Sequence, residues 1–353
     1  MKRGEPGSIL IIRLSSMGDV VLTTHLVRNL RIAFPKARID FITAKPFSEI
    51  YRLNPHITNL YEYDKNWDNS DIKMFKKNIM ESCNYEKYDL LIDLQRNIRT
   101  LLLRKGLGKK IVKVRKNRLN KLSLVYLKKN IFKEIKPIPE IYFDTISEFN
   151  VNDDGKGLDL WLQEDKASGN YLTYSKNIVN NDKISIAIAP GAYHTTKRWL
   201  PERFAELIKV LKKNYNAETT LIGGISDIEI TKKIIELSGE NVIDNSGSDS
   251  IISTAKIIDN CNLLITNDTG LMHIAAARQV AVVAIFGSTV KDFGFTPFRV
   301  NHFVVEKDIP CRPCTHIGRN SCPKGHFNCM NDISVDDVSK AVESILNNNS
   351  NRK

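Results

Sequence analysis

A short apolar run that breaks into a polar turn and resumes as an alanine-rich segment constrains the fold more than any other stretch of this chain. Residues 263–277 read Leu-Leu-Ile-Thr-Asn-Asp-Thr-Gly-Leu-Met-His-Ile-Ala-Ala-Ala. The bounded run with its β-branched end predicts a strand, and the alanines predict a helix. Strand, tight turn and helix in this order are typical of a parallel α/β sheet, whose ligands bind at the carboxyl edge of the strands.

The turn in this stretch has the features of an anion-binding site. A helix that begins near Thr269 would direct unpaired backbone N–H groups and the positive end of its dipole at a ligand, and Gly270 lets an anion come close. Asp268 and Thr269 could instead serve only as an N-cap. His273 lies one helical turn further on and adds a polar ring that a purely structural helix would not need. We therefore interpret the turn as a binding site for a diphosphate.

Positive charge is concentrated in one stretch of the sequence. The 353 residues have a net charge of +12, and residues 96–136 alone contain 15 lysines and arginines against the single acid Glu134. We call residues 96–136 the basic stretch. It indicates an anionic partner such as nucleic acid, a phosphorylated glycan or a membrane surface, although a run of charge can also be simply a solvated face.

Signals for export or for membrane insertion are not apparent in the sequence. The first apolar run, residues 9–12, is too short for a signal peptide, and no run approaches the length of a membrane span. Four of the six cysteines lie between Cys311 and Cys329, which favours reduced thiols or a local metal site over distributed disulfides. We therefore expect a cytoplasmic protein.

Alternating strand and helix patterns predict an α/β fold with two Rossmann-like, doubly wound halves that face each other across a cleft. The strands expected in the first half are residues 8–14, 39–43, 57–61 and 90–94, with a helix over 20–34. Those expected in the second half are residues 184–189, 219–222, 242–243, 263–266 and 281–286, with helices from 201 to 211 and from 250 to 260.

A polar stretch divides the chain into two expected domains. Composition turns polar between residues 150 and 182, which predicts an interdomain linker. The expected domains are residues 1–165, which include the basic stretch, and residues 180–333. Residues 334–347 are expected to form a C-terminal helix that begins with the capping-box pair Ser334 and Asp337.

Two further glycine-containing turns follow expected strands. One is Ser15-Ser16-Met17-Gly18-Asp19 in the first half, and the other begins with Pro190-Gly191-Ala192 and continues to Lys197-Arg198-Trp199 in the second. Both lie at the strand edge where an α/β sheet binds its ligands.

Three motifs together resemble the ADP-heptose:lipopolysaccharide heptosyltransferases, glycosyltransferase family nine. They are residues 13–23 (RLSSMGDVVLT), Pro190-Gly191 with Lys197-Arg198-Trp199-Leu200-Pro201, and residues 267–273 (NDTGLMH), and they occur in the order and spacing of the family. The resemblance spans nearly the whole chain. It implies a GT-B fold, with the acceptor in the N-terminal domain and the nucleotide-sugar in the C-terminal domain. It also implies inverting transfer of heptose from ADP-heptose to the inner core of lipopolysaccharide, without a catalytic metal or a cofactor.

The chemistry of such a transfer assigns roles to the turns. A carboxylate must take the proton of the acceptor hydroxyl, and a cation must stabilise the departing diphosphate. Asp19 suits the first task and Lys197 the second, although an Asp in this position can also be a helix N-cap and a loop Lys is usually a solvated charge. The residues expected to bind the donor are Gly191, Ala192, Lys197, Asp268, Thr269, Gly270, Leu271 and His273. Those expected to bind the acceptor are Gly18, Arg96, Arg99 and Arg104.

The cysteine cluster suggests a metal site outside the chemistry. Cys311, Cys314, Cys322 and Cys329 are acceptable ligands for a tetrahedral zinc ion, but their spacing is not that of a standard zinc finger or ribbon. Similar segments are familiar from the heptosyltransferase II branch of the family, which this chain resembles most. A structural zinc ion and simple reduced thiols both stay open.

Two classes of function follow from these patterns. The preferred one is a glycosyltransferase whose basic stretch meets the phosphorylated lipopolysaccharide core at the inner face of the cytoplasmic membrane, where the protein would be peripheral. A transferase for another nucleotide-sugar is an alternative within this class. The other class is a nucleic-acid-binding protein, but the basic stretch lacks interleaved aromatic residues for stacking bases, and the two turns of the second half would have no use.

Overall fold

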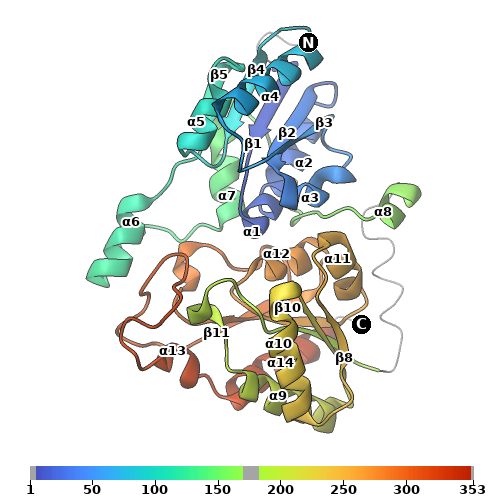
Figure 1. Ribbon diagram of the computed structural model, residues 1–353, viewed down its shortest axis with the longest axis vertical. Helices are drawn as coiled ribbons and strands as arrows, with labels where there is room; N and C mark the ends of the chain where they lie inside the picture. Colours follow the sequence, from blue (N-terminus) through green and yellow to red (C-terminus); the bar gives the residue numbers. More distant parts are fainter. Residues whose placement is uncertain (1–4, 170–182, 351–353) are drawn as a thin grey trace. The chain divides into compact units, whose positions relative to one another are not determined.

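The computed structural model describes residues 5–169 and 183–350 and divides the chain into two compact units (Figure 1). Unit 1 consists of Met1–Lys116 and Ile138–Ala167, and unit 2 consists of Asn117–Pro137 and Ser168–Lys353. Each unit contains one sheet in which all paired strands are parallel. The expected α/β class with two doubly wound halves is confirmed.

Unit 1 has a five-stranded sheet with the strand order β3-β2-β1-β4-β5. Its strands are β1 (Ser8–Ile12), β2 (Arg38–Ala44), β3 (Asn59–Tyr63), β4 (Tyr88–Asp93) and β5 (Gly108–Lys113). Its helices are α1 (Met17–Val21), α2 (Thr24–Ala33), η1 (Lys45–Phe47), α3 (Glu49–Arg52), α4 (Asn69–Ser82), α5 (Ile98–Arg104), α7 (Ile138–Phe143), η3 (Asp144–Phe149) and α8 (Gln163–Ser168). The central strand β1 is completely buried from Ile9 to Ile12, so it forms the middle of the core.

Unit 2 has a six-stranded sheet with the strand order β11-β10-β9-β6-β7-β8. Its strands are β6 (Ser185–Ala189), β7 (Glu218–Gly223), β8 (Ile243–Ser246), β9 (Leu263–Asn267), β10 (Ala281–Phe286) and β11 (His302–Glu306). Its helices are α6 (Arg118–Leu122), η2 (Ser123–Leu127), η4 (Thr195–Lys197), α9 (Pro201–Tyr215), η5 (Ile225–Asp227), α10 (Ile228–Ser238), α11 (Ile251–Asp259), α12 (Gly270–Ala277), η6 (Lys291–Phe293), α13 (Asn328–Asn331) and α14 (Val335–Ser350).

One large apolar cluster holds the sheet of unit 2 to α9 and α14. Phe204, Leu207 and Leu211 of α9 are buried in it, as are Val338 and Val342 of α14. These side chains recur at three- and four-residue intervals, which is the spacing of one helix face. The expected C-terminal helix is therefore part of unit 2 and covers its core.

The helix expected over residues 20–34 is interrupted in the structure. It forms two helices, α1 and α2, with Thr23 and Thr24 at the break. The Thr23 hydroxyl donates to the Val20 carbonyl at 2.6 Å, and the Thr24 hydroxyl donates to the Val21 carbonyl at 2.7 Å. Threonine hydroxyls that bond back to the preceding turn compete with the helical backbone bonds, which explains the break.

The unit boundaries differ from a simple division of the chain into halves. We expected the whole basic stretch in the N-terminal domain, but its residues 117–137 group with unit 2. The reason is packing, because Leu124 and Val125 are buried against Phe293 of unit 2. Of the expected linker, residues 170–182 lie outside the described part of the chain.

Candidate active site

Each sheet has one point where the strand order reverses, and the predicted site residues follow the strands at these points. In unit 1, β1 lies between β2 and β4, so the loops after β1 and β4 leave the sheet in opposite directions. In unit 2 the same holds for the loops after β6 and β9. Crevices at such switch points are the usual ligand sites of open α/β sheets. Asp19 follows β1, Lys197 follows β6, and Asp268 follows β9.

Asp19 lies in the first turn of α1 and makes an ion pair with Arg13. The Arg13 guanidinium nitrogen Nη2 is 2.6 Å from Asp19 Oδ1, and the two side chains are 11% and 17% exposed. The other oxygen, Oδ2, accepts hydrogen bonds from the Ser16 backbone N–H at 3.2 Å and from the Ser16 hydroxyl at 2.9 Å. Asp19 thus does take part in a helix cap, but the ion pair is more than a cap requires.

The surroundings of Asp19 keep its carboxylate ionised. Burial alone would raise its pKa, but the Arg13 charge and the Ser16 donors outweigh burial and lower the pKa below its ordinary value. The Tyr142 hydroxyl donates to Asp19 Oδ1 at 3.2 Å. Burial raises the pKa of Tyr142, more than the Arg13 charge lowers it, so this hydroxyl keeps its proton.

A network between the loops after β1 and β4 fixes the position of the Asp19 turn. Gln95 Oε1 accepts from the backbone N–H groups of Leu14 at 2.7 Å and Ser15 at 3.2 Å. Arg13 Nη1 donates to the Leu94 carbonyl at 2.6 Å. The loop after β4 therefore supports both Arg13 and the turn that carries Asp19, and Gly18 of this turn is buried.

The three arginines expected to bind the acceptor have different surroundings. Arg96 and Arg99 are exposed at the start of the basic stretch. Arg104 is only 13% exposed and makes an ion pair at 2.8 Å with Asp93, whose side chain is fully buried at the end of β4. Because Arg104 compensates a buried charge, we remove it from the acceptor-binding set and retain Arg96 and Arg99.

Lys197 and Asp268 meet at the switch point of unit 2. Lys197 Nζ is 2.7 Å from Asp268 Oδ2 and donates to the Asp268 carbonyl at 3.3 Å. The same oxygen Oδ2 accepts from the Thr289 hydroxyl at 2.6 Å. The Lys197 side chain is 15% exposed, so the ammonium group is fixed and only partly hydrated before any ligand arrives.

The helix start predicted from the sequence is present beside this pair. Thr269 is the N-cap of α12, and its hydroxyl accepts from the Leu271 N–H at 3.4 Å. Gly270 and Leu271 are partly exposed at this helix start, and His273 is buried one turn further on. Because Asp268 is engaged by Lys197 and Thr289, Thr269 alone provides the cap. The helix start and Lys197 both favour an anion.

The turn after β6 is bound to the end of β9 by Asn267. Its side-chain amide donates to the Pro190 carbonyl at 2.7 Å and accepts from the Trp199 N–H at 3.0 Å. Gly191 and Ala192 are buried in this turn. A Cβ at Gly191 would come within 2.2 Å of the Asp227 carboxylate, so any other residue here would force Asp227 to move.

Several residues of these sites were not assigned to them from the sequence. They are Arg13, Gln95 and Tyr142 around Asp19, and Asp227, Asn267, Ser288 and Thr289 in the turns around Lys197. Ser288 donates to the hydroxyl of Thr196, the neighbour of Lys197, at 3.0 Å. A signal for Ser288 and Thr289 was present, because Gly287-Ser288-Thr289 follows β10 as a polar turn at the same sheet edge. Nothing local in the sequence points to Tyr142, which lies 123 positions after Asp19.

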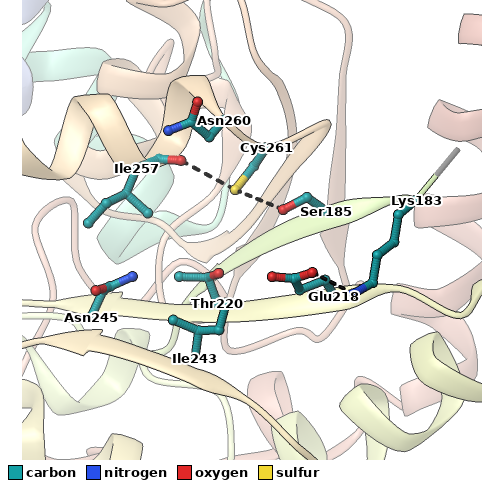
Figure 2. A pocket seen from close by; sticks show the side chains of 9 residues that line it. All are labelled: Lys183, Ser185, Glu218, Thr220, Ile243, Asn245, Ile257, Asn260 and Cys261. Carbon is teal, nitrogen blue, oxygen red and sulfur yellow. Dashed lines mark hydrogen bonds and ion pairs between the residues drawn. The ribbon is translucent and has the colours of Figure 1, made fainter. Parts of the chain in front are cut away.

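A cavity of about 380 Å³ lies at the opposite edge of the sheet of unit 2 (Figure 2). It is lined by the beginnings of β6, β7 and β8 and by the end of α11, including Ser185, Thr220 and Cys261. Ligands of parallel sheets bind at the carboxyl ends of the strands, not at this amino edge. We therefore do not include this cavity in the candidate site.

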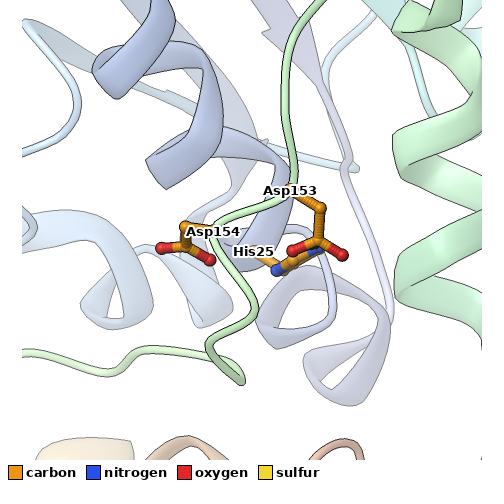
Figure 3. Close-up of side chains that lie close together, drawn as sticks. All are labelled: His25, Asp153 and Asp154. Carbon is orange, nitrogen blue, oxygen red and sulfur yellow. Dashed lines mark ion pairs between the residues drawn. The ribbon is translucent and has the colours of Figure 1, made fainter.

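Among the residues that the structure describes, one group of potential metal ligands has its atoms within 4.8 Å of one another, namely His25, Asp153 and Asp154 (Figure 3). Arg28 donates to both oxygens of Asp154, at 2.7 and 3.0 Å. The guanidinium group is also 3.5 Å from His25 Nδ1. A fixed positive charge inside the group opposes a cation, so we interpret it as an ion-pair network that attaches residues 153–159 to α2.

The four clustered cysteines do not form a preformed metal site. Ligands in a zinc–thiolate tetrahedron lie within about 4 Å of one another, yet no three of these described thiols approach within 4.8 Å. Cys311 Sγ lies 3.8 Å from His326 Nε2. Burial, with neighbouring cysteines adding to it, raises the pKa of Cys329 to about 12. Of the two alternatives left open by the sequence, this arrangement fits reduced thiols better than a structural zinc ion.

In the described ranges, every helix is too short or too polar to cross a membrane.

Comparison with known sequences identifies a family. The family described as "Glycosyltransferase family 9 (heptosyltransferase)" matches residues 77–324. Lipooligosaccharide heptosyltransferase 2 of Campylobacter jejuni is 32% identical over 177 residues, which are 48% of this chain and 54% of that protein. The chain thus spans about half the length of the first curated relatives it matches. Relatives named heptosyltransferase 1 and heptosyltransferase 2 both match.

Comparison with solved structures confirms the fold. A glycosyltransferase family 9 protein from Veillonella parvula is 24% identical and has a TM-score of 0.76, over 96% of this chain and 97% of that chain. Escherichia coli heptosyltransferase WaaC, solved with ADP, is 20% identical and has a TM-score of 0.70, over 96% and 99%. These likenesses support the GT-B arrangement of two Rossmann-like domains that the motifs implied.

Proposed function

The chain belongs to glycosyltransferase family 9 (heptosyltransferase), and from this premise we propose that it transfers heptose from ADP-heptose to the inner core of a lipopolysaccharide or lipooligosaccharide. The observation that carries the proposal is that a carboxylate lies at the switch point of one sheet and a cationic group lies at the switch point of the other. Unit 1 presents the ionised carboxylate of Asp19, and unit 2 presents Lys197 beside the start of α12. A glycosyl transfer needs one base and one cationic site for a diphosphate.

The proposed reaction is a single inverting displacement. The acceptor hydroxyl oxygen attacks the anomeric carbon while Asp19 takes the proton of that hydroxyl, and the bond between the anomeric carbon and the diphosphate oxygen breaks. The electron pair of this bond leaves with ADP. Lys197 and the N–H groups at the start of α12 stabilise the negative charge that develops on the diphosphate.

The ADP-heptose donor is supported by the relatives and not by a base-specific contact in this chain. Escherichia coli WaaC was solved with ADP, and several matched proteins are named heptosyltransferase 2. We propose ADP-heptose as the donor and the heptosyltransferase II branch as the closest one. Calorimetry and hydrolysis with ADP-heptose, UDP-sugars and GDP-sugars, with DNA binding as a control, should show selective use of ADP-heptose. Preference for another nucleotide-sugar would reject this donor assignment.

Lys197→Ala is expected to weaken donor binding about ten- to hundredfold. A charge-assisted hydrogen bond contributes about 1.5–3 kcal/mol, and the variant also leaves the Asp268 carboxylate without its cation near the diphosphate. Isothermal titration with ADP-heptose measures this loss. The variant should also lose stability, because Asp268 is then a mostly buried carboxylate without its cation, although the Thr289 hydroxyl still donates to it. Titration is therefore done well below the melting temperature of the variant.

Lys233→Ala is a suitable control for this variant. Lys233 also pairs with a carboxylate of unit 2, Glu202, at 2.6 Å, but both side chains are about half exposed and lie on α9 and α10. Its removal should leave donor affinity unchanged. If Lys197→Ala bound ADP-heptose with wild-type affinity, Lys197 would not be part of the diphosphate site.

The double variant Arg96→Gln/Arg99→Gln is expected to raise the apparent KM for a phosphorylated acceptor and to leave donor affinity unchanged. Both side chains are exposed, so their attraction to acceptor phosphates is screened by salt, and the difference from wild type should shrink at high ionic strength. Lys109→Gln/Lys110→Gln removes two exposed charges of the same basic stretch from β5 and serves as the control. If the two double variants had the same acceptor KM at low salt, Arg96 and Arg99 would be solvated surface charges with no specific role in acceptor binding.

A further inference from the structure

An unusual number of apolar side chains are exposed in residues 117–137, which we call the amphipathic segment. Six of the nineteen large hydrophobic residues that are exposed in the described ranges lie in it, and they are Leu119, Leu122, Tyr126, Leu127, Ile131 and Ile135. Leu119 and Tyr126 are 77% and 71% exposed. Concentrated exposed apolar side chains mark a surface that contacts another partner.

The segment is attached firmly to unit 2 by its other side. Leu124 and Val125 are buried against Phe293. Lys128 Nζ donates to the carbonyls of Cys311 at 3.0 Å and Pro313 at 2.7 Å. The exposed side chains therefore belong to a segment that is packed against unit 2. Leu119, Leu122, Tyr126 and Leu127 lie on the exposed side of α6 and η2, and Ile131 and Ile135 follow outside these helices.

The charges of the segment complement an anionic surface. It contains six lysines and arginines and the single acid Glu134. The Lys128 ammonium group is hydrogen-bonded to backbone carbonyls, but Arg118, Lys129 and Lys133 are exposed. An apolar face bordered by basic side chains is the pattern of helices that lie in the interface of an anionic bilayer.

From the exposed apolar face and the surrounding positive charge, we infer that residues 117–137 are a membrane-contact element that inserts Leu119, Leu122 and Tyr126 into the headgroup region of an anionic lipid bilayer. The inference rests on the proposed function only in that a lipid-linked acceptor is presented at such a surface. A protein partner or a second copy of the chain would not require the excess of basic residues.

Vesicle binding tests the inference directly. The wild-type protein should float with vesicles of equal parts phosphatidylcholine and phosphatidylglycerol, should bind pure phosphatidylcholine vesicles much less, and should be released in part by high salt. Leu119→Ser/Tyr126→Ser should weaken binding to the anionic vesicles by about tenfold or more, because two apolar side chains no longer insert. Lys129→Gln/Lys133→Gln should weaken it mainly at low salt.

The matched control is Ile225→Ser/Leu237→Ser. These residues are 61% and 42% exposed and lie in η5 and α10, outside the amphipathic segment but in the same unit. The control should bind anionic vesicles as the wild type does. Tyr126→Trp provides an independent measurement, since the added indole emission should shift to the blue when anionic vesicles are present.

Several results would overturn the inference. The first is a wild type that does not bind anionic vesicles, and the second is a Leu119/Tyr126 variant that binds them as well as the control does. The third is a wild type that self-associates through this face. Light scattering would detect it as a higher mass for the wild type than for the Leu119/Tyr126 variant. Transfer to a deacylated, water-soluble core acceptor separates this question from the proposed function. The Leu119/Tyr126 variant should retain that transfer, whereas failure of the proposed function would abolish it in the wild type as well.

Discussion

Replacing Asp19 with asparagine is expected to lower the turnover number by about 10²–10⁴-fold, the usual contribution of a general base. Asparagine has nearly the same size and still accepts a hydrogen bond from the Ser16 N–H, but it cannot take the proton of the acceptor hydroxyl. Donor affinity should be unchanged, because the donor groups Lys197 and Thr269 belong to unit 2. Single-turnover kinetics and titration with ADP-heptose measure the two quantities.

The same variant should also lose stability. In the wild type, Arg13 is balanced by Asp19 at 2.6 Å, and both side chains are mostly buried. Asparagine leaves the Arg13 charge uncompensated, which should cost about 1–3 kcal/mol. Assays therefore need a temperature well below the melting temperature of the variant, which separates a chemical defect from unfolding.

Asp71→Asn is the matched control for Asp19→Asn. Asp71 occupies the equivalent position in the first turn of α4, where its carboxylate accepts from the Asp68 N–H at 3.1 Å, as the Asp19 carboxylate accepts from the Ser16 N–H. Loss of this cap should affect only stability. If Asp19→Asn retained wild-type turnover, or behaved like Asp71→Asn, the general-base assignment would be wrong.

The parts of the fold that could be predicted from the sequence are those with a strong local pattern. Residues 263–277 form β9 and α12, as expected from the apolar run and the alanines. The strand β5 was missed because its sequence, GKKIVK, contains three lysines and is largely exposed. Charged edge strands resist aggregation, and for that reason they lack the apolar run by which buried strands are recognised.

The polar turns of the candidate site could be located from the sequence, but the partners of their side chains could not. Asp19 and Lys197 follow strands in both the expected and the observed fold. Whether Asp19 has a cationic partner depends on how its turn is held, and Gln95, which holds it, lies about 80 positions away on the neighbouring strand end. Packing also decides that residues 117–137 join unit 2, since their partner Phe293 is distant in sequence.

Replacing Arg13 with methionine is expected to move the acidic limb of the pH–rate profile to higher pH. In the wild type the Arg13 charge and the Ser16 donors lower the pKa of Asp19 against the opposing effect of burial. Without the charge, burial is opposed only by the Ser16 donors and the Tyr142 hydroxyl, so the pKa of Asp19 rises and the base becomes protonated at a higher pH. The measurement is kcat as a function of pH with saturating donor and acceptor.

Arg13→Met should also lower the stability of the protein. Breaking a buried ion pair from one side typically costs about 3–5 kcal/mol, and since both side chains are partly exposed we expect a loss near the lower end for Arg13→Met. The lowered pKa of Asp19 in the folded wild type means that its contribution to stability is complete above the unfolded pKa and is lost as the pH falls through the folded pKa. The acid-induced decrease in melting temperature should therefore be smaller in Arg13→Met than in wild type.

Arg13→Lys distinguishes a positioning role from a merely structural one. Lysine restores the charge beside Asp19 but cannot also donate to the Leu94 carbonyl through a second guanidinium nitrogen, as Arg13 does at 2.6 Å. The acidic limb should return toward its wild-type position while part of the stability loss persists. If Arg13→Met and Arg13→Lys both lowered stability but left the pH–rate profile of the wild type unchanged, Arg13 would support only the fold, and the acidic limb would not report the protonation of Asp19.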